Sequence, residues 1–165
     1  MIDAELRAAA TRVLDACRAR KWKVATAESC TGGLVAGALT EIAGSSDVVD
    51  RGFVTYSNEA KQAMLDVPAD TLTRFGAVSR ETAEAMAQGA LAHADADLAV
   101  SITGIAGPGG GSPEKPVGLV HFAAATRGGR LIHHEARYGD IGRGEVRRRS
   151  VLQALAMLET LATQA

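Results

Sequence analysis

The sequence contains few aromatic residues and no surplus of either charge. One Trp, two Tyr and three Phe make up only 4% of its 165 residues, and the formal net charge at pH 7 is -1. Nucleic acids are bound by basic surfaces, and single strands also need aromatic rings on which bases stack. Because both features are scarce, we expect no nucleic-acid partner.

The sequence also contains few cysteines and histidines and no long apolar run. The two cysteines, Cys17 and Cys30, have no CxxC spacing, and the four histidines do not form a cluster with metal-ligand spacing. No apolar run reaches the roughly 18 residues needed to cross a bilayer, and the N-terminus lacks the pattern of a secretion signal. We therefore expect no metal, no membrane contact and a cytoplasmic location.

What is present is an apolar fraction of 47% carried by small aliphatic residues, which predicts close packing of helices on a sheet. The one segment rich in Gly and Pro, 105–117, lies between apolar segments, so we interpret it as a site loop and expect a single domain over residues 1–165. The pattern predicts helices at 3–20, 31–44, 58–65, 80–94 and 143–163, and strands at 23–28, 48–57, 97–104, 118–126 and 130–138.

Helices alternate with strands along most of this order, which is typical of a three-layer α/β/α sandwich. The apolar segment 97–104 suits a central strand, and the last two strands are expected to form a hairpin, so the sheet should be mixed. Gly44 is expected to end the second helix, Asn58 to cap the third, and Ser79 to start the fourth.

The segment TAESCTGG, residues 26–33, follows an expected strand and precedes a helix. Ser29, Cys30 and Thr31 stand directly before Gly32 and Gly33, where ligands collect at the carboxyl ends of strands in open α/β sheets. A capping role would explain one of the two hydroxyls. A reactive Ser29 is the competing interpretation, and it requires a group that takes its proton.

No histidine has the spacing of a catalytic partner, which leaves lysine as the base. Lys61 follows a strand end in the segment TYSNEAK, within the first turn of its helix. Both the helix terminus and burial would lower its pKa and favour a neutral amine. Tyr56, at the end of the same strand, could join its hydrogen-bond network, although a solvated lysine and a structural tyrosine are the plainer interpretation.

Two further segments offer groups that bind anions. The loop GIAGPGGGSPEKPVG contributes flexible backbone donors, and the segment GDIGRGEVRRRS contributes arginines at a helix start. Each signal is weak alone, because a solvated basic face explains the arginines equally well. The candidate binding residues are Ser101, Thr103, Gly104, Gly107, Gly109, Gly110, Arg143 and Arg147.

Four segments together resemble the CinA C-terminal domain family in its stand-alone nicotinamide-nucleotide amidase form. They are TAESCTGG, AGSSDVVDRGFVTYSNEAK, FGAVS and SITGIAGPGGGSPEKPVG, and the resemblance extends over nearly the whole chain. It implies hydrolysis of the carboxamide of nicotinamide mononucleotide to nicotinate mononucleotide and ammonia, a mixed sheet of about five strands, no metal or other cofactor, and often a homo-oligomer. Longer relatives carry an extra N-terminal domain with pyrophosphatase activity, and within these 165 residues we expect no such domain.

Carried over by motif, the resemblance makes Ser29 the nucleophile and Lys61 its general base, with Tyr56 beside them. The family's GDR arginine corresponds best to Arg143, but Ile141 and Gly142 interrupt the motif here, so Arg147 stays a rival. Backbone N–H groups of Cys30, Thr31, Gly32 and Gly33 would hold the oxyanion, and the glycine loop with Ser101 or Thr103 and the arginine would hold the phosphate and ribose.

Three alternatives stay open at this point. Cys30, beside Glu28, is a possible thiol nucleophile for the same reaction. A nucleotide-sensing or protein-interaction module with a silent pocket is a second possibility, and the intact Ser29, Tyr56 and Lys61 weigh against it. The third is hydrolysis of another nucleotide amide or of a phosphoanhydride.

Overall fold

The computed structural model describes residues 2–164 and contains one five-stranded mixed sheet in the order β2-β1-β3-β4-β5. Strands β1, β2 and β3 are parallel, and β4 runs antiparallel to both β3 and β5. The expected mixed sheet is therefore confirmed. The strands are β1 Val24–Glu28, β2 Val49–Val54, β3 Leu98–Gly104, β4 Leu119–Thr126 and β5 Leu131–Arg137.

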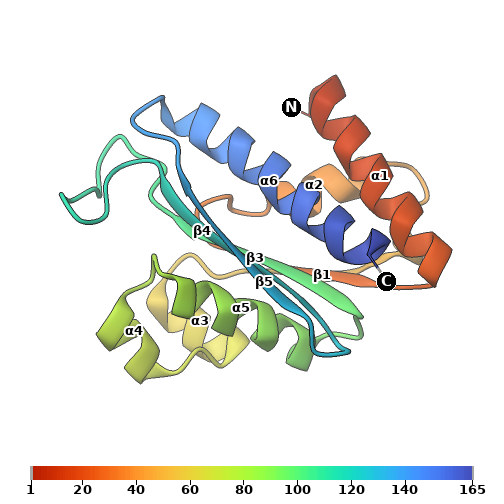
Figure 1. Ribbon diagram of the computed structural model, residues 1–165, viewed down its shortest axis with the longest axis horizontal. Helices are drawn as coiled ribbons and strands as arrows, with labels where there is room; N and C mark the ends of the chain where they lie inside the picture. The colour runs from red at the N-terminus through yellow and green to blue at the C-terminus, as the bar shows by residue number, and fades with distance from the viewer. Residues whose placement is uncertain (1, 165) are drawn as a thin grey trace.

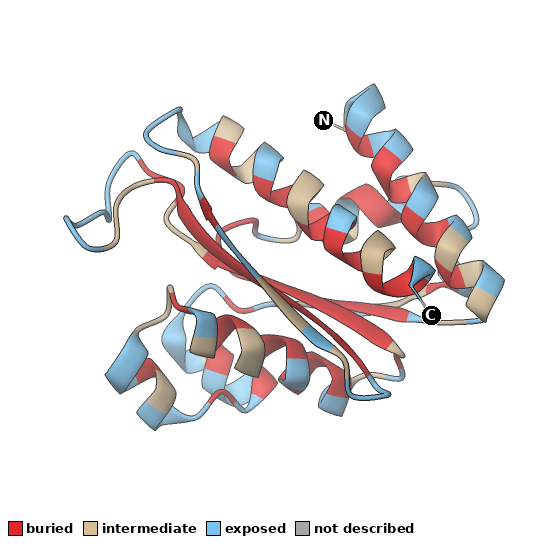
Figure 2. Ribbon diagram, viewed as in Figure 1, coloured by how far each residue is buried: buried red, intermediate tan, exposed pale blue. Residues whose placement is uncertain are grey.

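Helices cover both faces of this sheet, as a three-layer sandwich requires (Figure 1). One layer holds α1, α2 and α6, and the other holds α3, α4 and α5. The helix surfaces that face the sheet are buried, and the outer surfaces are exposed (Figure 2). The helices are α1 Ala4–Arg20, α2 Leu34–Thr40, α3 Asn58–Leu65, α4 Ala69–Phe75, α5 Arg80–His93 and α6 Arg143–Thr163, with a short 3-10 turn at Ser45–Asp47.

The core on both sides of the sheet consists mainly of Ala, Val and Leu, as the composition predicts. The central strand β3 is buried along nearly its whole length, and β4 is buried throughout. Small side chains allow close contact between layers: at Gly89 of α5, an added Cβ would lie 2.0 Å from the carbonyl oxygen of Leu65. That contact fixes α3 against α5.

Several element boundaries differ from the sequence prediction. The second helix is shorter than residues 31–44, because Gly32 and Gly33 have φ of 58° and 102° and lie outside the helix. Gly44 does not end this helix but precedes the 3-10 turn. The cap of α3 is Ser57 rather than Asn58, since the Ala60 N–H donates to the Ser57 hydroxyl at 3.0 Å.

Helix α4 was not predicted from the sequence. Its only buried side chain is Leu72, so it lacks the apolar repeat that identifies a helix. The start of α5 is as expected, because the Ser79 hydroxyl accepts from the Thr82 N–H. No helix within residues 2–164 has the length and apolarity needed to cross a membrane.

The topology brings three segments to one edge of the sheet. The chain leaves β1 toward β2 on one side, and β3 then pairs with β1 on the other side. Such a reversal leaves a crevice beyond the carboxyl ends of the parallel strands. Residues that follow β1, β2 and β3 therefore meet there.

Candidate functional site

Ser29 lies immediately beyond the end of β1, at the bottom of this crevice. Its backbone N–H donates to the carbonyl of Ile102 on β3 at 2.9 Å, which continues the sheet pairing by one residue. The two left-handed glycines, Gly32 and Gly33, then turn the chain into α2. Ser29 is 8% exposed. Its hydroxyl is therefore placed by a rigid strand rather than by a free loop.

Lys61 comes from α3 and points back toward β1. Its Nζ lies 3.0 Å from the Ser29 Oγ and donates to the carbonyl oxygen of Thr55 at 2.8 Å. The side chain is 1% exposed, and it makes no ion pair with a residue in the described range 2–164. Burial without an acidic partner lowers the pKa of Lys61 below its ordinary value of 10.5. This amine is suited to accept a proton from Ser29.

Cys30, the alternative nucleophile, is in a less reactive state. The thiol is buried, and burial raises its pKa to about 11. The nearby carboxylate of Glu28 acts in the same direction. Because the thiolate is the nucleophilic form of cysteine, this environment disfavours attack by Cys30.

A cavity of about 260 Å³ opens above the Ser29 and Lys61 pair. Its lining combines apolar side chains, among them Ala77 and Val78, with the glycine loop that follows β3. A few polar groups among apolar side chains are typical of sites that hold a small organic ligand. The lining residues are Ser29, Cys30, Tyr56, Lys61, Ala77, Val78, Thr103, Gly104, Ile105, Ala106, Gly107, Gly109, Gly110 and Arg143.

Tyr56 and Arg143 meet at the mouth of this cavity. Arg143, the first residue of α6, donates to the Tyr56 hydroxyl at 2.9 Å and to the carbonyl oxygen of Gly107 at 2.8 Å. Tyr56 is 62% exposed. Its hydroxyl therefore pairs with Arg143 and not with Lys61, contrary to the hydrogen-bond network expected from the sequence.

Arg147 does not line the cavity. Its guanidinium donates from Nε to the carbonyl oxygen of Cys30 at 3.1 Å and from Nη2 to that of Thr31 at 3.3 Å. Of the two rival arginines, Arg143 faces the cavity and Arg147 lies behind the turn that carries Ser29. About one turn of α6 separates the two arginines, so Arg143 contacts the cavity and Arg147 contacts the backbone of the turn 29–33.

The structure separates the other predicted binding residues into two groups. Thr103 lines the cavity, with its hydroxyl donating to the carbonyl of Ala77 at 2.7 Å. Ser101 is wrong as a substrate contact, because it is fully buried and donates to the carbonyl of Ala83 on α5. The side chain of Thr31 is also buried, and its hydroxyl donates to Glu28 at 2.6 Å. Gly32 and Gly33 shape the turn without lining the cavity.

Sequence reasoning missed two contributors. The apolar side chains of Ala77 and Val78 come from the segment between α4 and α5; the motif FGAVS pointed to this segment, but no site role was expected for its residues because they carry no reactive group. Glu28 is a fully buried carboxylate one residue before Ser29. The sequence did contain a signal for Glu28, since it is a charged residue at the end of a strand that is otherwise apolar or uncharged. Within residues 2–164, no three His, Cys, Asp or Glu side chains are placed to hold a metal ion.

The chain is similar to proteins of a known family. Residues 6–162 match the model of the CinA C-terminal domain. The chain belongs to the CinA C-terminal domain family. A family member from Escherichia coli (strain K12), named nicotinamide-nucleotide amidohydrolase PncC, is 54% identical over 159 residues, which cover 96% of this chain and 95% of the relative.

Solved structures of CinA family proteins share the same architecture. The crystal structure of competence/damage inducible protein CihA from Agrobacterium tumefaciens matches with a TM-score of 0.96 and 58% identity, covering 99% of each chain. A longer CinA-like protein from Synechococcus sp. (strain RCC307) is 53% identical over 150 residues, which are 90% of this chain but 36% of that protein. The α/β/α fold with its mixed sheet is thus the fold of the CinA family.

Proposed function

We propose that this chain is an amidohydrolase that converts nicotinamide mononucleotide to nicotinate mononucleotide and ammonia, a salvage step in NAD metabolism. The observation that carries the proposal is the 3.0 Å contact between the Ser29 Oγ and the buried Lys61 Nζ at the floor of a cavity. The E. coli relative's name supplies the substrate class, since it is a nicotinamide-nucleotide amidohydrolase.

In the first step, the neutral amine of Lys61 takes the proton of Ser29, and the Oγ attacks the carboxamide carbon of the substrate. The lowered pKa of Lys61 supports this role, because only the neutral amine accepts a proton. Negative charge develops on the carbonyl oxygen. The backbone N–H groups of Cys30 and Thr31 make no hydrogen bond to other groups of residues 2–164 and are available to bind that oxyanion.

Collapse of this intermediate breaks the carbon–nitrogen bond, and ammonia leaves with the proton returned by Lys61. A water molecule then attacks the acyl-Ser29 ester while Lys61 accepts its proton, and Lys61 returns that proton to the Ser29 Oγ as the ester bond breaks and the carboxylate product leaves. The position of Tyr56 on Arg143, away from the amine, supports Lys61 alone as the proton carrier.

Substrate binding is assigned to two parts of the cavity lining. The apolar side chains of Ala77 and Val78 suit the pyridine ring, and the loop that contains Gly107, Gly109 and Gly110 offers backbone donors at the mouth. Arg143 suits the 5′-phosphate, because a guanidinium binds phosphate through two parallel hydrogen bonds. Its present partners, the Tyr56 hydroxyl and the Gly107 carbonyl, are neutral and would be exchanged for the anion.

An ammonia-release assay tests this function directly. Purified protein should release ammonia from nicotinamide mononucleotide and should strongly prefer it to nicotinamide riboside, which lacks the phosphate. Binding of the nucleotide without ammonia release would overturn the proposal and favour a sensing or interaction module. Equal rates on the two compounds would remove the phosphate role of Arg143 but keep the amidase.

A further inference from the structure

Glu28 directs its carboxylate into the turn that carries Ser29. Although the side chain is fully buried, three donors converge on it: the Thr31 hydroxyl at 2.6 Å, the Val35 N–H at 2.9 Å and the Ala36 N–H at 3.0 Å. A buried carboxylate is stable only when its oxygens are satisfied in this way. Glu28 and its partners thus form one fixed unit.

This carboxylate replaces a cap that α2 lacks. The residue before the helix is Gly33, which has no side chain to bind the first N–H groups. Glu28 binds two of those N–H groups from the end of β1 and binds the Thr31 hydroxyl in the middle of the turn. Glu28 therefore fixes the turn 29–33 in two places: in its middle, through Thr31, and where it runs into α2, through Val35 and Ala36.

Arg147 holds the same turn from the opposite direction. It binds the carbonyl oxygens of Cys30 and Thr31. In a planar trans peptide the carbonyl and the next N–H point in opposite directions. Fixing the Cys30 carbonyl toward α6 therefore aims the Thr31 N–H away from it. In the preceding peptide, the Ser29 carbonyl accepts from the Gly32 N–H at 3.0 Å, which fixes the Cys30 N–H.

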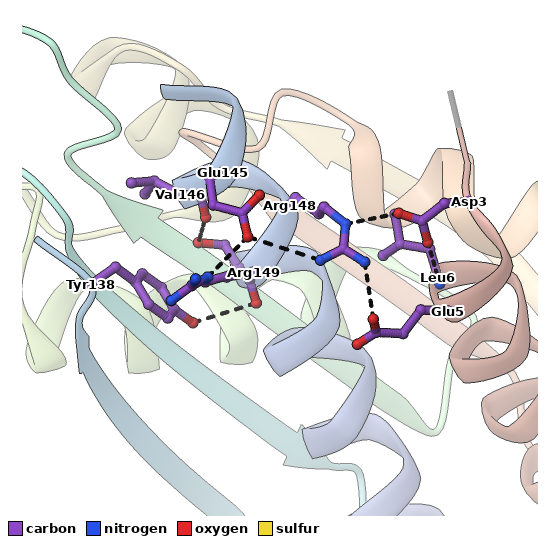
Figure 3. Close-up of polar contacts among 9 residues, drawn as sticks. Asp3, Glu5, Leu6, Tyr138, Glu145, Val146, Arg148 and Arg149 are labelled. Carbon is purple, nitrogen blue, oxygen red and sulfur yellow. Dashed lines mark hydrogen bonds and ion pairs between the residues drawn. The ribbon is translucent and has the colours of Figure 1, made fainter. Parts of the chain in front are cut away.

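The helix that supplies Arg147 is itself anchored. Arg148, the next residue, binds Asp3, which caps α1, at 2.7 Å and Glu5 in the first turn of α1 at 3.0 Å, and Arg149 binds Glu145 at 3.0 Å within α6 (Figure 3). These contacts fix the first turns of α6 against α1. The guanidinium of Arg147 thus reaches the turn from a rigid support.

We propose that Glu28 and Arg147 are positioning residues for the reaction: together they fix the peptide units of the Ser29–Gly33 turn so that the Ser29 hydroxyl and the Cys30 and Thr31 N–H groups keep a catalytic arrangement. The inference rests on the proposed amidohydrolase function. Neither residue takes part in proton transfer. Loss of either should slow the chemical step and leave substrate binding almost unchanged, because the phosphate and ring contacts lie elsewhere in the cavity.

The test compares Glu28→Gln and Arg147→Lys with the wild-type protein. Glutamine keeps the shape of Glu28 but presents an NH2 group to at least one of the three donors, and lysine keeps the charge of Arg147 but cannot bind two carbonyls in its fork. For each variant we expect kcat on nicotinamide mononucleotide to fall by about tenfold or more and KM to stay within about threefold, since small displacements of reacting groups can cost about a hundredfold.

Asp97→Asn is the matched control. Asp97 is also a carboxylate that accepts from a backbone N–H, that of Lys23 at 2.9 Å, and it precedes β3, whereas the cavity lies beyond the other end of that strand. This variant should lose thermal stability and keep the wild-type kcat when measured while fully folded. An equal fall of kcat in Asp97→Asn would show that general loosening explains the effect, and the positioning role would be rejected.

A second measurement separates this inference from the proposed substrate. A fluorophosphonate probe reacts with an activated serine: the Oγ–phosphorus bond forms, fluoride leaves, and the serine proton goes to Lys61. Mass spectrometry gives the rate of Ser29 labelling without any substrate. We expect labelling to slow by about tenfold in Glu28→Gln and Arg147→Lys, because the same N–H groups would bind the phosphoryl oxygen.

The outcomes are distinct. If the wild-type protein releases no ammonia but is labelled at Ser29, and the variants are labelled slowly, the substrate is wrong and the positioning role stands. If both variants turn over and are labelled within about twofold of wild type, the positioning role is wrong whatever the substrate. Should Glu28→Gln not fold, Thr31→Val removes one of its three donors and is expected to show the same loss at smaller size.

Discussion

The Nζ of Lys61 lies 3.0 Å from the Oγ of Ser29, although 32 residues separate them in the chain. The two come from adjacent parallel strands: Ser29 follows β1, and α3 with Lys61 follows β2. The amine is buried among neutral groups, and its other acceptor is the Thr55 carbonyl at 2.8 Å. This contact joins a hydroxyl that needs a base with an amine whose pKa is lowered by burial.

Replacement of each candidate nucleophile should separate Ser29 from Cys30. Ser29→Ala is expected to lower kcat for ammonia release by at least about 10³-fold, as loss of a catalytic nucleophile does. Cys30→Ala removes a buried thiol whose pKa is raised to about 11, so activity should remain within about tenfold. The opposite pattern in the same assay would assign the reaction to the thiol.

The pH dependence of kcat should report the protonation of Lys61. Because burial lowers its pKa, activity should rise with pH and reach half its maximum below 10.5, the ordinary lysine value. Lys61→Arg should be inactive at every pH, since a guanidinium stays protonated, and Lys61→Met should be equally inactive. Ammonia release by the wild-type protein and by both variants, measured over a range of pH, tests this prediction. A Lys61→Met protein with the wild-type pH profile would exclude the lysine as base.

Arg143 should act on the phosphate and not on the amide. Arg143→Met is expected to raise KM for nicotinamide mononucleotide by about tenfold or more, the usual cost of a lost charge-assisted hydrogen bond. Kinetics on nicotinamide riboside should be unchanged. Tyr56→Phe removes one partner of the guanidinium and is the milder companion variant. A similar loss on both compounds would mean that Arg143 supports the fold of the cavity instead.

The histidine pair on β4 and β5 should make stability sensitive to acid. His121 Nδ1 lies 2.9 Å from His133 Nε2, so one ring donates and the other must accept. Burial, and then His133, lower the pKa of His121 below 6.5. A lowered histidine pKa favours the neutral ring in the folded state, so the stabilisation is complete above pH 6.5 and is lost as pH falls below that value.

Urea unfolding from pH 8 to pH 5 checks this expectation. Each unit by which the folded pKa lies below 6.5 adds about 1.4 kcal/mol to the loss of unfolding free energy. His121→Phe should flatten the dependence, and His134→Gln, at the adjacent position of β5, should leave it unchanged. If His121→Phe keeps the wild-type slope, the acid sensitivity comes from other groups.

Much of the fold was predictable because its signals are local. The apolar period of α1 and α6, the β-branched strands and the Ser79 cap each depend on neighbouring residues. The exceptions follow the same logic. Helix α4 buries only Leu72 and gives no periodic signal. The start of α2 was placed too early because the left-handed conformations of the two glycines before it depend on the turn around them.

From the sequence, the candidate site residues could be predicted: a serine before two glycines, a lysine after a strand and a glycine-rich loop, each at the end of a strand. The contacts that these residues make could not be predicted, because they depend on the tertiary structure. It placed Tyr56 on Arg143, turned Ser101 into the core, and set Arg147 behind the turn with Glu28. Such contacts depend on the order and twist of the strands and on the packing of α6, because these bring together residues that are far apart in the chain.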